Sequence, residues 1–140
     1  MKLKLVTLSG VKLSEDVYEV QIPTAAGDIS VFDDHEPLVT IANPGALLVR
    51  RHKDDSDDDQ EIYAINGGAV HIMKNEVKIL VDEADHADDI VAGEAEAALE
   101  RARQHRQGAK DAVSISEAEA MINRAQVRLK VAGLRRRHRH

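Results

Sequence analysis

Alternating apolar and polar residues run through the first half of the chain. Residues 17–24 and 76–82 place apolar side chains at every second position, with polar residues at most of the positions between them. A period of two is the pattern of a β-strand with one buried face and one exposed face. The predicted inward-facing side chains are Tyr18, Val20 and Ile22 in the first segment and Val77, Ile79 and Val81 in the second.

Further apolar runs occur at residues 46–50, 61–65 and 69–73. Clusters of Gly, Pro, Asn and Asp separate the runs, and these residues favour turns because they supply special backbone angles or local hydrogen bonds. Seven or more short strands without helices between them predict an antiparallel β-sandwich or barrel over residues 1–87. The expected turns lie at residues 26–28, 43–45, 66–68 and 74–76.

The periodicity changes after Asp82. Residues 82–108 are rich in alanine, begin with acidic side chains and end with basic ones, which suits the dipole of a helix. Residues 114–134 predict a second helix, and Gly133 is expected to end it. Two capping boxes fit its amino terminus, Ser114 with Glu117 and Ser116 with Glu119.

Each predicted helix has a narrow apolar stripe at near-heptad spacing, so the two are expected to pack as an antiparallel hairpin. Because most of the stripe is alanine, the seam buries little area, and the hairpin is expected to be marginally stable and able to open. Gly93 weakens the first helix by roughly 1 kcal/mol relative to alanine. The stripes consist of Ala92, Ala95, Leu99 and Ala102 in the first helix and Ala118, Ile122, Ala125, Leu129 and Ala132 in the second.

The second predicted helix has two more surfaces. Val127, Val131 and Leu134 lie roughly 180° from the seam at 100° per residue, so this stripe needs a further partner, either another protein or the sandwich of the same chain. Basic residues between the two stripes are either a solvated face or a surface for an acidic partner. These basic residues are Arg124, Arg128 and Arg135, and the chain ends in RRRHRH.

Charge divides the chain into two parts. Residues 1–87 carry 8 basic and 17 acidic side chains, a net charge of −9, whereas residues 88–140 carry 11 basic and 8 acidic, a net charge of +3. We therefore expect a sandwich domain at 1–87 and a helical hairpin with a basic tail at 88–140. The chain has no cysteine, which excludes disulfides, thiol nucleophiles and cysteine-based zinc sites. Its amino terminus lacks the pattern of a signal or transit peptide.

No catalytic motif occurs, and no cofactor or metal site is predicted. The aspartate run at residues 54–59 resembles a calcium loop only in part, because Gln60 stands where the loop requires glycine and Asn66 where it requires glutamate. A solvated hairpin tip is the better interpretation. His35, which follows two aspartates in a turn, is interpreted as a structural hydrogen-bonding residue.

An ordered set of segments then identifies a family. GDISVFDDHEPLVTIANPGALLVR, followed by INGGAVHIMKNEVKILVDEADHADDI, EAEAALERA and NRAQVRLKVA, resembles the epsilon subunit of the bacterial and plastid rotary ATP synthase, equivalent to the mitochondrial delta subunit. The resemblance spans nearly the whole chain. It implies a non-catalytic rotor subunit of the F-type ATP synthase that couples the catalytic head to the membrane ring and restrains ATP hydrolysis through its carboxyl-terminal helices.

In this family the sandwich touches the gamma subunit and the polar loops of the membrane ring. The resemblance therefore implies a docking rim at residues 28–37, although Asp33 and Asp34 stand where many relatives have Pro-Gly. When the hairpin extends, the arginine row Arg124, Arg128 and Arg135 is expected to contact an acidic segment of a catalytic beta subunit in the alpha-beta head. The rim residues are Asp28, Phe32, Asp33, His35 and Pro37.

Some family members bind ATP through an Ile/Leu-Asp-x-x-Arg-Ala motif at the start of the first helix. The matching stretch here is IVAGEA, with Val91 in place of the aspartate and Glu94 in place of the arginine. A carboxylate in place of a phosphate-binding cation repels the nucleotide, so this chain is not expected to sense ATP.

Two other functions are compatible with the residue patterns alone. A nucleic-acid-binding module could use the basic tail, but the acidic sandwich repels phosphate and few aromatic residues are present for stacking. A small binding module with a ligand pocket or an acidic protein partner is the other alternative. For the rotor subunit, the expected location is the cytoplasmic face of the bacterial plasma membrane, or the thylakoid for a plastid protein, as part of the complex.

Overall fold

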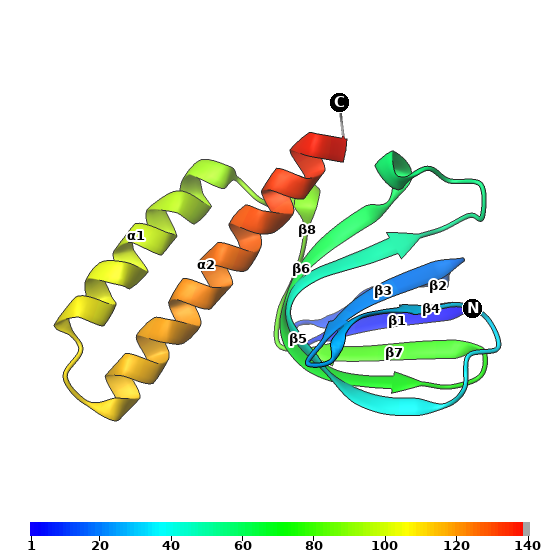
Figure 1. The fold of residues 1–140 in the computed structure, drawn as a ribbon, viewed down its shortest axis with the longest axis horizontal. Helices are drawn as coiled ribbons and strands as arrows, with labels where there is room; N and C mark the ends of the chain where they lie inside the picture. The colour runs from blue at the N-terminus through cyan, green and yellow to red at the C-terminus, as the bar shows by residue number, and fades with distance from the viewer. Residues whose placement is uncertain (139–140) are drawn as a thin grey trace.

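The computed structural model describes residues 1–138, with side chains through Arg135. A curled β-sheet forms a two-layered sandwich, and a pair of antiparallel helices lies beside it (Figure 1). The predicted fold class is confirmed. The strands are β1 (Lys2–Thr7), β2 (Gly10–Asp16), β3 (Glu19–Thr24), β4 (Gly27–Val31), β5 (Leu38–Arg50), β6 (Glu61–Ile72), β7 (Glu76–Val81) and β8 (Ala84–His86); the short helices are η1 (Asp57–Asp59) and η2 (Ala87–Asp89), and the long ones α1 (Ala92–Gly108) and α2 (Ala112–His138).

The strands follow the order β2-β1-β7-β6-β5-β3-β4, and β8 pairs with β6 outside this path. Neighbouring strands are antiparallel, as expected, with one exception: β1 and β7 are parallel. The first half of β6 pairs with β8 and its second half with β7. One long strand therefore links the side of the sandwich next to the helices to the rest of the sheet (Figure 1).

Two of the expected turns, at residues 43–45 and 66–68, are wrong. Both segments lie inside long paired strands, β5 and β6, which bend there and do not reverse (Figure 1). Gly67 has a φ of 91°, and a Cβ atom on Gly68 would lie 2.0 Å from the carbonyl oxygen of Leu80. The glycines thus permit a bend with close backbone approach, a known role of glycine within strands.

The main core lies between the two layers of the sandwich. It is aliphatic, as the composition predicts, and the inward positions predicted from period two are buried: Val20, Ile22, Val77, Ile79 and Val81. Tyr18 is an exception, since it precedes β3, is only half-buried and packs edge-on against Phe32 with the ring centroids 5.5 Å apart. The core is thus built from β-branched and leucine side chains that fit a pleated surface.

The first helix starts later than predicted. Residues 84–86 form strand β8 and residues 87–89 form η2, so α1 begins at Ala92. The Nδ1 atom of His86 accepts a hydrogen bond from the backbone N–H of Asp88, which caps η2. The acidic residues of this segment therefore belong to the connection between sandwich and hairpin, and not to a helix start.

The predicted hairpin seam is present. Ala95, Ala102, Ala118 and Ala125 are buried between α1 and α2, while Leu99, Ile122 and Leu129 are half-buried. Neither predicted capping box forms the start of α2; Asp111 does, because its carboxylate accepts the backbone N–H of Ser114 at 2.7 Å. Gly133 does not end α2, which continues to His138.

A second apolar cluster joins α2 to the sandwich. Val131 is completely buried in it, and Val127 and Leu134 pack at its edge, so the partner of the second stripe is the chain's own sandwich. Ala92 and Ala132, predicted for the seam, also contribute here. Opposite α2, the cluster contains Ala46 and Leu48 of β5, Ile62 and Ala64 of β6, and Ala87 and Ile90 of the connection between β8 and α1.

Candidate functional site

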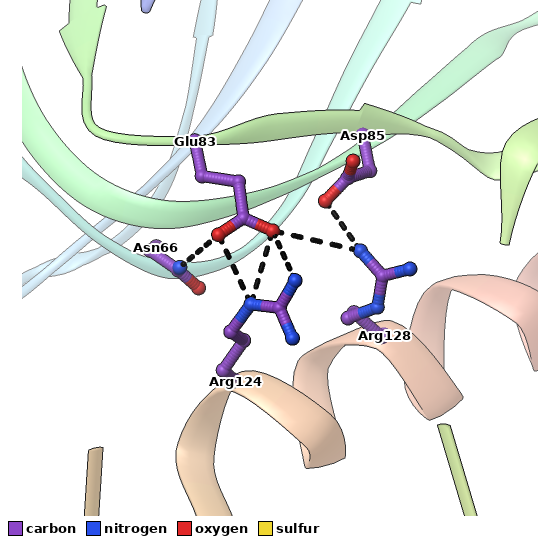
Figure 2. Close-up of polar contacts among 5 residues, drawn as sticks. All are labelled: Asn66, Glu83, Asp85, Arg124 and Arg128. Atoms are coloured by element: carbon purple, nitrogen blue, oxygen red, sulfur yellow. Dashed lines mark hydrogen bonds and ion pairs between the residues drawn. The ribbon is translucent and has the colours of Figure 1, made fainter. Parts of the chain in front are cut away.

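The arginine row on α2 faces the connection between the sandwich and the helices. Arg124 and Glu83 form a bidentate pair: Nε of Arg124 lies 3.0 Å from both carboxylate oxygens of Glu83, and an Nη atom lies 2.6 Å from one of them (Figure 2). The amide of Asn66 donates to the same carboxylate at 3.4 Å. A fork of this kind fixes the position of the guanidinium as well as attracting it.

The other two arginines make similar contacts further along α2. Arg128 forms an ion pair with Asp85 and lies 3.6 Å from Glu83 (Figure 2). Arg135 forms an ion pair with Asp88. Only 18% of the Arg128 side chain is exposed, so this pair is the most sheltered of the three. The structure does not describe the side chains of the rest of the basic tail, residues 136–140.

The local charges shift the pKa of several of these groups. Hydrogen bonds from Arg124 hold the pKa of the Glu83 carboxyl below its ordinary value, and Glu83 in turn raises the pKa of Arg124. Burial, together with the nearby Glu83, raises the pKa of the Asp85 carboxyl. Ionised Glu83 therefore favours the docked helices.

The predicted rim residues do not form a single cluster. Asp28 lies in β4 four residues before Phe32, and the strand separates the two, since Asp28 pairs with Pro23 while Val31 pairs with Val20. Asp28 accepts a hydrogen bond from the side chain of Gln21 at 3.3 Å. It therefore stands apart from the other four rim residues, which belong to the loop between β4 and β5.

The loop between β4 and β5 is held by the start of the chain and by the turn between β6 and β7. Asp33 forms an ion pair with the amino terminus at 2.8 Å, and the backbone N–H of Asp34 donates to the carbonyl of Lys74. The Nδ1 atom of His35 lies 2.7 Å from the carbonyl oxygen of Glu36, which fits its interpretation as a structural hydrogen-bonding residue. Phe32 and Pro37 are exposed.

An exposed row of apolar side chains crosses the sheet and was not predicted from the sequence. Strand pairing places Ile41 beside Ala69, Ala69 beside Leu80, Leu80 beside Val6, and Val6 beside Val11. Directly paired residues share a face of the sheet. Ile41 is 69% exposed and Val11 is 64% exposed. We call Val6, Val11, Ile41, Ala69 and Leu80 the apolar row; an exposed patch of this kind often marks a protein interface.

The aspartate run forms an ordered hairpin tip. Arg50 donates to the carbonyl oxygen of Asp55 and to the carboxylates of Glu19 and Asp57, and Ser56 and Asp59 cap η1. Within the residues whose placement is described, no group of three or more His, Asp or Glu side chains is arranged to hold a metal ion.

The stretch that matches the nucleotide motif lies at the start of α1. Val91 is exposed, and Glu94 lines a shallow hollow of about 220 Å³ between α1 and α2. Arg124 and Arg128 line the same hollow, but both are already paired with Glu83 and Asp85. Arg101 also lines the hollow. With an acidic side chain at Glu94 and two of its three cations already paired, the hollow is a poor environment for a polyphosphate.

The protein has two parts, a β-sandwich with an exposed apolar face and a helical hairpin that is ion-paired to it. Comparison with known proteins identifies the family to which it belongs. Residues 1–87 match the family model of the β-sandwich domain of the ATP synthase delta/epsilon chain. The chain belongs to this family, which confirms the resemblance noted in the sequence.

Relatives match over nearly the full length. The ATP synthase epsilon chain of Herpetosiphon aurantiacus is 37% identical over 97% of this chain and 96% of its own length. The chloroplastic epsilon chain of Oltmannsiellopsis viridis is 32% identical over 95% and 98%. Among solved structures, a chain of the Euglena gracilis mitochondrial ATP synthase aligns with a TM-score of 0.75 and 27% identity, covering 89% of this chain and 76% of that one.

Proposed function

We propose that this protein is a non-catalytic rotor subunit of an F-type ATP synthase. The observation that carries the proposal is the match of both parts of the chain, sandwich and hairpin, to ATP synthase epsilon chains over nearly their full lengths. The likeness to a chain of a solved assembly of F1 and c-ring supports a place in the central stalk. The absence of any motif for chemistry in the sequence agrees with a coupling role.

The sandwich supplies the contacts with the rotor. The apolar row offers an apolar surface on which the gamma subunit can pack. The loop of residues 32–37 offers polar and aromatic groups for the loops of the membrane ring. Asp28, at the far end of β4, contacts a different part of the partner from Phe32 or His35. No described helix is long and apolar enough to cross a membrane. As a member of the complex, the subunit lies at the cytoplasmic face of the membrane in a bacterium or at the thylakoid in a plastid.

The hairpin supplies regulation. In the structure it is docked on the sandwich, and its arginines face inward. When the hairpin swings away, Arg124, Arg128 and Arg135 are exposed together on one side of α2 and contact an acidic segment of a catalytic beta subunit. A helix inserted in the head in this way restrains ATP hydrolysis.

The test replaces the native subunit in its host complex by a variant with Arg124→Ala, Arg128→Ala and Arg135→Ala. ATP hydrolysis is expected to rise, because the extended hairpin loses its contacts in the head. Lys130→Ala, an exposed basic residue on the same helix, is the matched control and should leave hydrolysis at the native rate. Equal hydrolysis by the native and triple-variant complexes would contradict the inhibitory role.

A further inference from the structure

The three acidic partners of the arginine row lie within six consecutive residues. Glu83, Asp85 and Asp88 belong to the segment that connects β7 to α1, whereas their partners are spread along α2. We call Glu83, Asp85 and Asp88 the acidic linker. During opening, α2 must leave the sandwich. In the docked form it is therefore ion-paired to the same connecting segment that would act as the hinge.

Figure 2 shows how Glu83 and Asp85 of the acidic linker contact two of the arginines. The carboxylates of Glu83 and Asp85 point away from the sheet toward α2, and the guanidinium groups of Arg124 and Arg128 point back toward them. The bidentate contact between Arg124 and Glu83 uses two donor atoms of the guanidinium. The edge formed by Nε and this Nη atom is the edge that a carboxylate on another protein would use for the same bidentate contact, so it cannot hold both ligands at once.

Apolar contact also holds the hairpin in place. On α2, Val131 is fully buried against the sandwich, and Val127 and Leu134 pack at the edge of the same cluster. α1 packs mainly on α2 and not on the sheet. Partly exposed ion pairs contribute about 0–1 kcal/mol each, so the three pairs adjust the docking equilibrium that the apolar cluster sets.

We infer that the acidic linker is an internal competitor for the arginine face of α2, so that docking of the hairpin and binding of an acidic protein segment exclude each other. The partner's identity in the complex rests on the proposed function, but the competition is a property of the isolated chain. Because only open chains can bind, the apparent affinity for an acidic segment equals the intrinsic affinity multiplied by the fraction of chains that are open.

The competition predicts opposite effects for two sets of variants that break the same ion pairs. Glu83→Gln with Asp85→Asn removes the internal ligand and leaves the arginines free. Arg124→Ala with Arg128→Ala removes the face itself. Both open the hairpin, but only the first improves binding of an acidic ligand. A simple structural role for the pairs would give no such difference.

The experiment uses the full isolated chain at neutral pH and low salt, with a poly-L-glutamate peptide as the acidic probe. Binding is measured by fluorescence anisotropy, and opening by the distance between spin labels on cysteines introduced into β4 and α2, which is practical because the chain has no native cysteine. Glu83→Gln with Asp85→Asn should bind the peptide about ten-fold more tightly and populate longer distances. Glu96→Gln with Glu100→Gln, which neutralises two exposed carboxylates on α1, is the matched control for net charge.

A charge exchange completes the test. Glu83→Arg with Arg124→Glu restores an ion pair between linker and helix, so the hairpin should return toward the docked distance. The exchanged chain should nevertheless bind poly-L-glutamate no better than the native chain, because α2 has lost a cation. Peptide affinity that is the same in the native and the Glu83→Gln, Asp85→Asn chains would overturn the inference. Failure of the hydrolysis test with an intact peptide result would instead overturn only the proposed inhibitory function.

Discussion

Arg128 on α2 forms an ion pair with Asp85 on β8, 43 residues earlier in the chain. The pair joins a helix of the hairpin to the short strand that pairs with β6. Because β8 is only three residues long and pairs with β6 alone, its position depends on such side-chain contacts as well as on its backbone hydrogen bonds. Opening of the hairpin is thus expected to loosen β8, because it removes the contact between Asp85 and Arg128.

The docked form should weaken in acid. The pKa of the Glu83 carboxyl is lowered from its ordinary value of 4.5, so its contribution is complete above pH 4.5 and is lost as the pH falls through the lowered value. Burial and the neighbouring Glu83 raise the pKa of the Asp85 carboxyl, whereas the docked Arg128 lowers it, so protonation of Asp85 also removes a contact of the docked form. Spin-label distances measured between pH 7 and about pH 3 should therefore lengthen in the native chain.

Glu83→Gln is the control for this pH dependence. It should open the hairpin partly at pH 7 and reduce the further opening on the acid side. An acid-induced opening of the same size in Glu83→Gln would show that another group is responsible.

Gly68→Ala should destabilise the sandwich. The new Cβ atom would lie 2.0 Å from the carbonyl oxygen of Leu80, so the backbone of β6 or β7 must move, at a cost of about 2–4 kcal/mol. Gly133→Ala in α2 meets no atom within 4 Å and should stabilise the helix by about 0.5–1 kcal/mol. Urea unfolding of both variants tests this, and a Gly68→Ala protein as stable as the native one would contradict the close approach.

Ile41→Asp should weaken assembly without unfolding the protein. Ile41 is 69% exposed, so a carboxylate there stays solvated in the free chain but is buried when the apolar row meets the gamma subunit. Ser30→Asp, at an exposed position in β4, serves as the control. Co-purification of the gamma subunit should fall for Ile41→Asp alone, with melting temperatures unchanged in both variants. Undiminished co-purification would place the gamma contact elsewhere.

A chain ending at residue 87 should keep a folded sandwich. Every member of the main core lies between Leu3 and Ala84, so removing both helices leaves that core complete. The cut does expose Ile62 and Ala64, which α2 covers in the full chain. Well-dispersed amide resonances, together with increased binding of a hydrophobic dye, are the expected results. Collapse of the amide dispersion would mean that the two parts fold only together.

MgATP should not stabilise the chain. Glu94 repels a phosphate, and Arg124 and Arg128 are engaged by Glu83 and Asp85. The melting temperature should be the same with and without millimolar MgATP, with MgCl2 alone as the control for the cation. A saturable rise in melting temperature would show that the nucleotide displaces these carboxylates.

The period of two and the alanine stripes were sufficient to predict the sandwich and the hairpin, because both patterns report which face of an element is buried. They could not locate the bends of β5 and β6. Gly67 and Gly68 suit a reversal of the chain as well as a bend, and the choice depends on long-range pairing with β5 and β7.

The candidate site was predicted only in part. Arg124, Arg128 and Arg135 were predicted as one face, but their partners were taken for the acidic start of a helix. The alternation of Glu83 and Asp85 was the available signal for a strand that presents both carboxylates to one side. The apolar row gave no such signal, because β5 is apolar on both faces around Ile41 and period two is lost there.

The most direct test of the central claim is native purification of this protein from its source membranes in mild detergent, with the bound polypeptides identified by mass spectrometry. A rotor subunit should bring down gamma together with alpha, beta and ring subunits in fixed stoichiometry. Recovery of the protein alone, or with nucleic acid, would contradict the assignment to the central stalk.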